Sequence, residues 1–167
     1  FFTKNMKEIN LKISGAFKSK IKYFFDERGF FCDLNITKFK RLKKINFSKN
    51  CLSFSKKNVI RGLHYQTKNS QGHFIHIIKG KVLDVGIDLR LSSKTFRKVT
   101  CNIIDTKNYN TLYLPPGVAH GFIALSKENL IFYRLSGVYN KSKEKIIKFE
   151  KSLVDAKFRN HFNKKLI

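Results

Sequence analysis

The feature that most constrains the fold of this chain is a series of short apolar segments, separated by turn residues at intervals of roughly 8–12 residues. The segments are rich in β-branched and aromatic residues, which favour strands. Short strands at this spacing are typical of a sandwich or barrel. The sequence therefore predicts an all-β fold with strands at Tyr23–Phe25, Phe30–Cys32, Val59–Gln66, His73–Ile78, Lys81–Leu89, Lys98–Ile104, Leu112–Leu114, Gly121–Ala124 and Leu130–Tyr139.

The 167 residues fit one domain with an extension. Ile36–Lys44 is predicted to form one short helix. After Tyr139 the chain becomes rich in lysine, with apolar residues at a roughly helical spacing. We therefore expect a barrel with N-terminal strands over residues 1–139. A basic, helical C-terminal extension over residues 140–167 is expected to pack on it through Leu153, Phe158 and Phe162.

The chain has 35 Lys or Arg residues, 11 Asp or Glu residues and a net charge of +24. Such a charge is compatible with nucleic-acid binding, but 28 of these cations are lysines spread along the chain, whereas bidentate recognition favours arginine. The sequence therefore predicts solvated surface lysines and no nucleic-acid partner. The positive field still attracts anionic ligands, nucleotide-linked ones included.

Membrane insertion is not expected, because no run of about 18 apolar residues occurs. Cys32, Cys51 and Cys101 are odd in number and widely spaced, so they form neither a disulfide framework nor a zinc knuckle. The sequence therefore predicts a protein of the reducing cytoplasm.

His64 follows Arg61 by three positions in Arg-Gly-Leu-His-Tyr-Gln, so a regular strand would place the two on opposite faces. A β-bulge at Gly62 would bring them to one face. Arg61 could then bind an anion while His64 acts as a base near neutral pH. An edge-strand Arg with a core His is the alternative at this point.

His120 ends the segment Pro115–His120, whose Pro-Pro-Gly favours a rigid turn that fixes the direction of the histidine. Pro-x-Gly-x-x-His resembles a signature of cupin barrels, in which this histidine often binds metal. Here, however, His73 and His76 are three residues apart and face opposite sides of a strand, and no Glu occurs between Glu27 and Glu128. We therefore expect no metal centre.

Tyr133 shares a strand face with Ile131 and Leu135. A tyrosine among apolar side chains belongs either to the core or to a pocket where its hydroxyl has a partner. Tyr139, at the end of the same strand, could stack on a flat ring.

These motifs resemble, in their order and spacing, the dTDP-4-dehydrorhamnose 3,5-epimerase family of cupin-fold sugar-nucleotide epimerases. The likeness runs from about Tyr23 to Tyr139, and Arg-Gly-Leu-His-Tyr-Gln is its most specific string. It is carried by segments 24–31, 53–55, 59–66, 71–73, 80–90 and 115–122, together with Tyr133 and Tyr139.

The resemblance implies a cupin-type double-stranded β-helix, or jelly-roll, barrel. It also implies a nucleoside-diphosphate 4-keto-6-deoxyhexose as substrate, with dTDP as the expected nucleotide. Protons at C3 and C5 are acidified by the C4 ketone, so no cofactor or metal is needed. His64 matches the family base, and Tyr133 matches the acid that returns the proton on the opposite face. The family further suggests a homodimer formed through β-sheet contacts, with an N-terminal segment that reaches the partner's pocket.

The other site residues follow from the same resemblance. His120 matches an active-site histidine and Asp84 its orienting partner. Arg28 and Arg61 match residues that hold the diphosphate. Asp33 stands where a substrate-binding Glu is usual. The remaining expected substrate contacts are Gln66, Lys49 and Tyr139.

Two departures from the family pattern stand out. His73 occupies the position of a lysine that points at the enolate oxygen. The family's aspartate partner of the base histidine lies in a C-terminal segment for which Asp155 is the best candidate here, and Glu144 falls near another family acid. Three functions stay open: an epimerase with an altered substrate or acting at C3 or C5 alone, a related isomerase, and a non-catalytic sugar-nucleotide-binding cupin.

Overall fold

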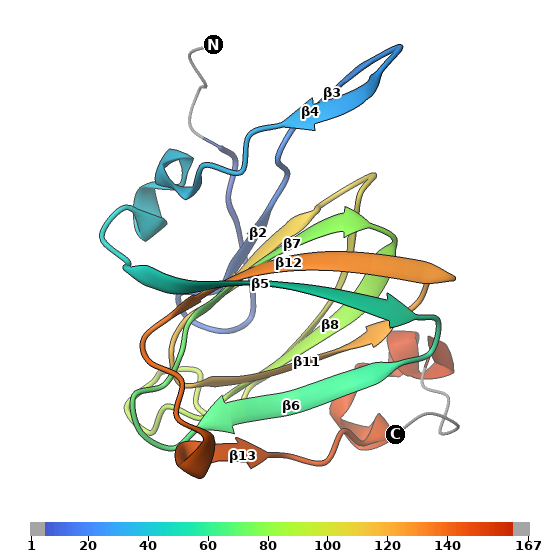
Figure 1. Ribbon diagram of the computed structural model, residues 1–167. Coiled ribbons are helices and arrows are strands. Elements are labelled where there is room, and N and C mark those ends of the chain that lie inside the picture. The colour runs from blue at the N-terminus through green and yellow to red at the C-terminus, as the bar shows by residue number, and fades with distance from the viewer. Residues whose placement is uncertain (1–5, 162–167) are drawn as a thin grey trace.

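Two antiparallel sheets face each other in this computed structural model, which describes residues 6–161 (Figure 1). The six-stranded sheet has the order β1-β2-β10-β7-β12-β5, and the five-stranded sheet has the order β13-β6-β11-β8-β9. The first sheet comprises β1 (Ile9–Asn10), β2 (Phe17–Ser19), β10 (Thr111–Leu114), β7 (His73–Lys79), β12 (Glu128–Ser136) and β5 (Phe47–Lys56). The second comprises β13 (Glu144–Ile146), β6 (Ile60–Gln66), β11 (Val118–Ala124), β8 (Lys81–Asp88) and β9 (Val99–Asp105).

Apolar side chains from both sheets fill the space between them, which follows from the period-two alternation of strands. On β8, for example, Val82 points into this inner core while Leu83 packs on the outer face. The C-terminal residues Phe149 and Val154 cover that outer face. On the other sheet, Phe39 and Leu42 cover the outer face around Phe17 and Phe74.

The jelly-roll prediction is confirmed, and every predicted strand segment corresponds to a strand. β1, β2, β5 and β13 were not among the predicted strands. Ile36–Lys44 does not form one helix but two 3-10 turns, η1 (Ile36–Lys38) and η2 (Lys40–Leu42). Phe39 separates the turns with an extended backbone, because its side chain is drawn into the core against Phe17 and Phe74.

The C-terminal extension packs on the barrel, but it is helical only as short 3-10 segments. These are η3 (Lys141–Lys143), η4 (Lys151–Leu153) and η5 (Ala156–His161), and strand β13 lies between the first two. Leu153 and Phe158 contact the outer core as expected. Phe162 and the remainder of the predicted extension lie outside the described residues.

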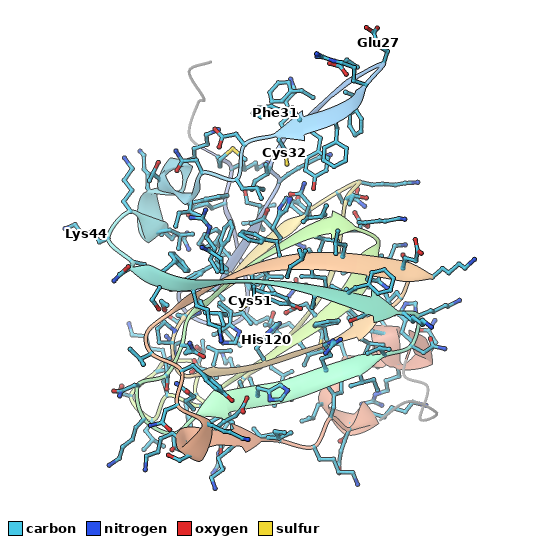
Figure 2. The ribbon with its side chains drawn as sticks, viewed as in Figure 1. Glu27, Phe31, Cys32, Lys44, Cys51 and His120 are labelled. Atoms are coloured by element: carbon cyan, nitrogen blue, oxygen red, sulfur yellow. The ribbon has the colours of Figure 1, made fainter. Side chains whose placement is uncertain are left out.

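A two-stranded hairpin, β3 (Tyr23–Asp26) and β4 (Gly29–Cys32), projects away from the barrel (Figure 1). Tyr23 anchors its base, because its hydroxyl bonds Nε2 of His76 at 2.8 Å. Glu27 lies at the far tip, as Figure 2 shows. The hairpin carries a cluster of exposed phenylalanines, Phe24, Phe25, Phe30 and Phe31.

No helix within residues 6–161 is long and apolar enough to cross a bilayer.

Candidate active site

A cavity of about 730 Å³ is lined by side chains from both sheets. β6 and β11 form one wall, and β5, β7 and β12 form the other. Eight of the eleven predicted site residues line it: His64, Tyr133, His73, His120, Arg61, Gln66, Lys49 and Tyr139. A ninth, Asp84, lies behind His120.

The predicted β-bulge is present on β6. His64 pairs with His120 and Arg61 pairs with Phe122, so two residues of β6 lie opposite the single residue Gly121 of β11. Both Arg61 and His64 consequently face the cavity. Only glycine fits at position 62, because its φ is +96° and a Cβ atom there would lie 2.4 Å from the carbonyl oxygen of His120.

His64 lies beside a carboxylate from the C-terminal strand. Its Nδ1 is 3.1 Å from Oε1 of Glu144, although the two groups are not aligned for a hydrogen bond. The other carboxylate oxygen of Glu144 accepts a hydrogen bond from the Tyr139 hydroxyl at 2.8 Å. Pairing of β13 with β6 places Ile146 opposite His64 and Glu144 opposite Gln66, so this acid is held by backbone hydrogen bonds. The contact leaves Nε2 of His64 as the nitrogen that can receive a proton.

Histidines from two sheets meet at the cavity. His73 and His76 face opposite sides of β7, as predicted: His73 reaches Nδ1 of His120 at 3.3 Å, whereas His76 bonds Thr111 on the outer side. Nε2 of His120 in turn contacts Oδ2 of Asp84 at 2.7 Å. Burial, together with the neighbouring His120 and His64, lowers the pKa of His73 to about 3.

Tyr133 faces the cavity with Leu135, and its hydroxyl has a hydrogen-bond partner in Oγ of Ser53 at 2.9 Å. Burial raises the pKa of Tyr133 to about 12, so the phenol is protonated at neutral pH. Because His64 belongs to the five-stranded sheet and Tyr133 to the six-stranded sheet, an imidazole and a phenol approach the cavity from opposite walls.

Cations border the same cavity. Nε of Arg61 donates to Oγ of Ser55 and its Nη2 donates to the carbonyl of Phe54, so β5 holds this guanidinium in place. Lys49 lies 5.1 Å from the centre of the Tyr139 ring. A cavity with fixed cations and an aromatic ring suits a phosphorylated ligand with a flat base.

Comparison with known proteins identifies the family. The family model described as dTDP-4-dehydrorhamnose 3,5-epimerase matches residues 10–165. The chain belongs to this family. The dTDP-4-dehydrorhamnose 3,5-epimerase of Salmonella typhimurium is 39% identical over 127 residues, which cover 74% of this chain and 69% of that protein. The Shigella flexneri enzyme of the same name is 37% identical over 144 residues, which cover 84% and 80%.

Solved structures of the epimerase family share the fold. The Legionella pneumophila enzyme, crystallised with dTDP-4-keto-L-rhamnose, has a TM-score of 0.80 and 33% identity, covering 89% of this chain and 80% of that one. The Sulfolobus tokodaii enzyme has a TM-score of 0.79 and 37% identity, covering 91% and 86%. The family and the barrel that the sequence predicts are therefore confirmed.

Two residues expected to bind substrate in an epimerase of this family do not reach the cavity of their own chain. Arg28 is at the hairpin tip, where it pairs with Asp26 at 2.6 Å. Asp33 pairs with Lys38, also at 2.6 Å. Their substrate-binding role stays a prediction, and it requires a cavity other than the one in their own chain.

Asp155 is not the partner of His64. Its carboxylate is 3.2 Å from Nζ of Lys12 instead, and Asp155 does not line the cavity that contains His64. Glu144 occupies the position beside the imidazole instead. The sequence placed Glu144 near a family acid but gave it no partner, since the pairing of β13 with β6 is not visible in a short polar segment.

Two polar residues at the cavity, Ser53 and Gln71, were missed. Ser53 was missed because its strand, β5, was not predicted from the sequence. Gln71 stands in the Gln-Gly-His string, and its Nε2 is buried without a hydrogen bond in the described structure, so a cavity ligand can accept from it. Gln66, predicted to bind substrate, already has its amide engaged by Asn69, Val138 and Asn140.

Among residues 6–161, no three His, Cys, Asp or Glu side chains gather in a metal-binding arrangement.

Proposed function

We propose that this protein epimerises a nucleoside-diphosphate 4-keto-6-deoxyhexose at C3, C5 or both. The observation that carries the proposal is the presence of His64 and Tyr133 on opposite walls of one cavity, in a chain of the epimerase family. The family name, and the dTDP-4-keto-L-rhamnose in the Legionella pneumophila structure, support a dTDP-linked sugar.

The chemistry follows from the carbonyl. Nε2 of His64 takes a proton from the carbon beside the C4 ketone, and the electron pair of the C–H bond forms the C=C bond of an enolate. The π electrons of the carbonyl move to its oxygen. The Tyr133 hydroxyl then returns a proton to carbon from the other wall, which inverts the configuration. A positioned acid or base typically contributes about 10²–10⁴-fold to such a step.

The groups around His64 and Tyr133 orient the substrate in the proposed reaction. Arg61 is placed to bind the diphosphate, Lys49 and Tyr139 lie at the cavity edge where the nucleotide fits, and Glu144 supports the base. His120 and Asp84 position His73. The ketone itself acidifies the C–H bonds, so the proposed reaction needs no cofactor.

We further propose a homodimer in which each hairpin contacts the partner copy. Phe25 on β3 is 75% exposed and Phe31 on β4 is 67% exposed. Figure 2 shows Phe31 on the projecting hairpin. Exposed phenylalanines grouped on one element are typical of an interaction surface. A hairpin that reaches across would also bring Arg28 toward the partner's cavity. The three unpaired thiols support a reducing compartment such as the cytoplasm.

Incubation with dTDP-4-keto-6-deoxyglucose in deuterated water tests the function. Deuterium entering at C3, C5 or both, read by NMR, supports epimerisation and identifies the carbon. His64→Asn is expected to abolish this exchange while retaining dTDP binding. Binding without exchange in the wild type would instead identify a non-catalytic sugar-nucleotide-binding protein, and undiminished exchange in His64→Asn would remove His64 as the base.

A further inference from the structure

A second cavity, of about 850 Å³, lies where the β3–β4 hairpin joins the barrel. Its lining comes from the segment before the hairpin, from the hairpin itself, from the end of β7 and from the turns after β7 and β9. It shares no lining residue with the cavity that contains His64. We call it the basic pocket, because Lys20, Lys22, Lys79 and Lys107 all line it.

The protein leaves most of the positive charge in the basic pocket without an acidic partner. Among residues 6–161, no Asp or Glu lines the pocket. Lys79 pairs with Glu128, whereas Lys20, Lys22 and Lys107 form no ion pair with any described residue. Nζ of Lys20 donates to the carbonyl oxygen of Lys107 at 2.5 Å, which holds this cation beside the turn after β9. Because like charges that line one pocket repel each other, an anion bound between them is stabilised.

Aromatic rings form another part of the lining. The rings of Tyr23 and Phe30 are stacked, with 4.8 Å between their centroids and 12° between their planes. Phe30 is 50% exposed, so its ring can also contact a ligand. Nucleotide bases stack on exposed aromatic rings, while phosphates bind ammonium groups through charge-assisted hydrogen bonds. The combination of rings and cations therefore suits a ligand that has both a flat base and phosphates, since a phosphate alone makes no use of the rings.

Buried side chains hold the walls of the basic pocket in place. Asn110, which is 1% exposed, donates to the carbonyl oxygen of Ile21 and accepts from its amide, at 2.9 Å and 2.8 Å. Asp105 accepts from two backbone amides of the turn after β9. Tyr23 is fixed by its hydrogen bond with His76. Because the cations and the rings are positioned before a ligand arrives, binding costs less conformational entropy.

We propose that the basic pocket binds a nucleoside polyphosphate, at a site separate from the proposed catalytic cavity. The phosphates contact the ammonium groups of Lys20, Lys22 and Lys107, and the base stacks on the ring of Phe30. The volume of about 850 Å³ lies within the range of roughly 300–1,000 Å³ that is usual for small-molecule sites. The ligand touches both the hairpin and the turns of the barrel, so its binding fixes the hairpin against the barrel. Binding here does not depend on the proposed epimerisation.

Calorimetric titration of the full chain with ATP, and separately with tripolyphosphate, tests for the base contact. ATP is expected to bind the wild type at least about fivefold more tightly than tripolyphosphate, because only ATP has a base that stacks. Phe30→Leu should remove this difference. Phe54→Leu changes an exposed ring that lines neither cavity, and it should keep the difference. Equal affinities of the wild type for the two probes would overturn the proposal.

The double variant Lys22→Ala, Lys107→Ala tests the phosphate contacts. Its affinity for ATP should be at least about 10-fold lower than that of the wild type, because two charge-assisted contacts are lost. The matched control is Lys57→Ala, Lys127→Ala. It removes the same charge from two exposed lysines of neighbouring turns that line neither cavity, and it should change the affinity by less than about threefold. Equal losses in the two double variants would show attraction by net charge alone and would refute a specific site.

Arg61→Ala distinguishes the two cavities. This variant lacks the cation that is proposed to bind the diphosphate of the substrate, so its affinity for dTDP should fall, while ATP should still bind in the basic pocket. Loss of ATP binding in Arg61→Ala, together with full binding in Lys22→Ala, Lys107→Ala, would place ATP in the catalytic cavity and contradict the proposal. A wild type that binds no ATP would also contradict it. If light scattering then gives the mass of a single chain for the lysine double variant only, a second copy of the chain occupies the pocket instead.

Discussion

Tyr133 combines two properties that suit an acid in the cavity. Burial holds its pKa near 12, so the hydroxyl is protonated across the physiological range, and Ser53 fixes its direction. The sequence indicated the face that Tyr133 shares with Ile131 and Leu135, but it could not supply the hydroxyl's partner. That partner, Ser53, lies 80 residues earlier in the chain, on β5.

We expect Tyr133→Phe to separate proton removal from inversion. Deuterium should still enter the substrate, since His64 remains, but epimerised product should form about 10²–10⁴-fold more slowly because the returning acid is lost. NMR of the product gives both quantities. Tyr113→Phe is the control, because Tyr113 is also buried, with a pKa raised to about 12, and does not line the cavity. Product formation at the wild-type rate in Tyr133→Phe would refute the assignment.

Glu144→Gln should lower kcat by about 10–100-fold with little change in KM. The carboxylate lies 3.1 Å from Nδ1 of His64 and stabilises by charge attraction the cation formed when Nε2 takes a proton. A 10–100-fold change in kcat corresponds to about 1.4–2.7 kcal/mol in the activation free energy. Steady-state kinetics give the effects on kcat and on KM separately. Glu128→Gln removes a carboxylate that pairs with Lys79, outside the cavity, and should leave kcat unchanged. A rise in KM alone would assign Glu144 to substrate binding instead.

At the scale of elements, β5 shows why part of the site escaped prediction. The strand alternates, but its inward residues Lys49, Cys51 and Ser53 are polar because they line a cavity instead of filling a core. A search for alternating apolar residues therefore finds the strands whose side chains fill the core. It misses a strand such as β5, whose inward side chains line the cavity. The bulge on β6 was predictable, because a regular strand would place Arg61 and His64 on opposite faces and the glycine between them, Gly62, favours a bulge.

The proposed homodimer depends on contacts made by the β3–β4 hairpin. Light scattering should give about twice the chain mass of 19.6 kDa for the wild type. The double variant Phe25→Ser, Phe31→Ser should give the mass of a single chain, because it removes two rings that are buried in the proposed contact. Leu91→Ser removes another exposed apolar side chain, one that lies away from the hairpin, and should not change the mass. A wild type with the mass of one chain would contradict the proposed homodimer.

At the scale of the whole molecule, buried histidines make stability depend on pH. Burial lowers the pKa of His76 to about 4, below the ordinary value of 6.5. The unfolded chain therefore gains a proton first as the pH falls, so stability is full above about pH 6.5 and declines toward pH 4. At 1.36 kcal/mol per unit, His76 contributes at most about 3 kcal/mol to this decline.

Urea unfolding between pH 7 and pH 4.5 measures this decline. His76→Gln should make the decline shallower, because one of the groups that gain a proton on unfolding is gone, while His73 retains its contribution. His161→Gln, at the end of η5 and outside the three core clusters, should retain the wild-type slope. An unchanged slope in His76→Gln would show that other groups account for the acid sensitivity.

The pairing of β13 with β6 joins two regions that are synthesised far apart in time. Until the later strand is made, the ribosome-bound chain has a bare sheet edge beside an imidazole that lacks its acidic neighbour. Docking of β13 therefore completes the sheet edge and brings Glu144 to His64 in a single step, so the backbone pairing and the charge environment of the imidazole are established together.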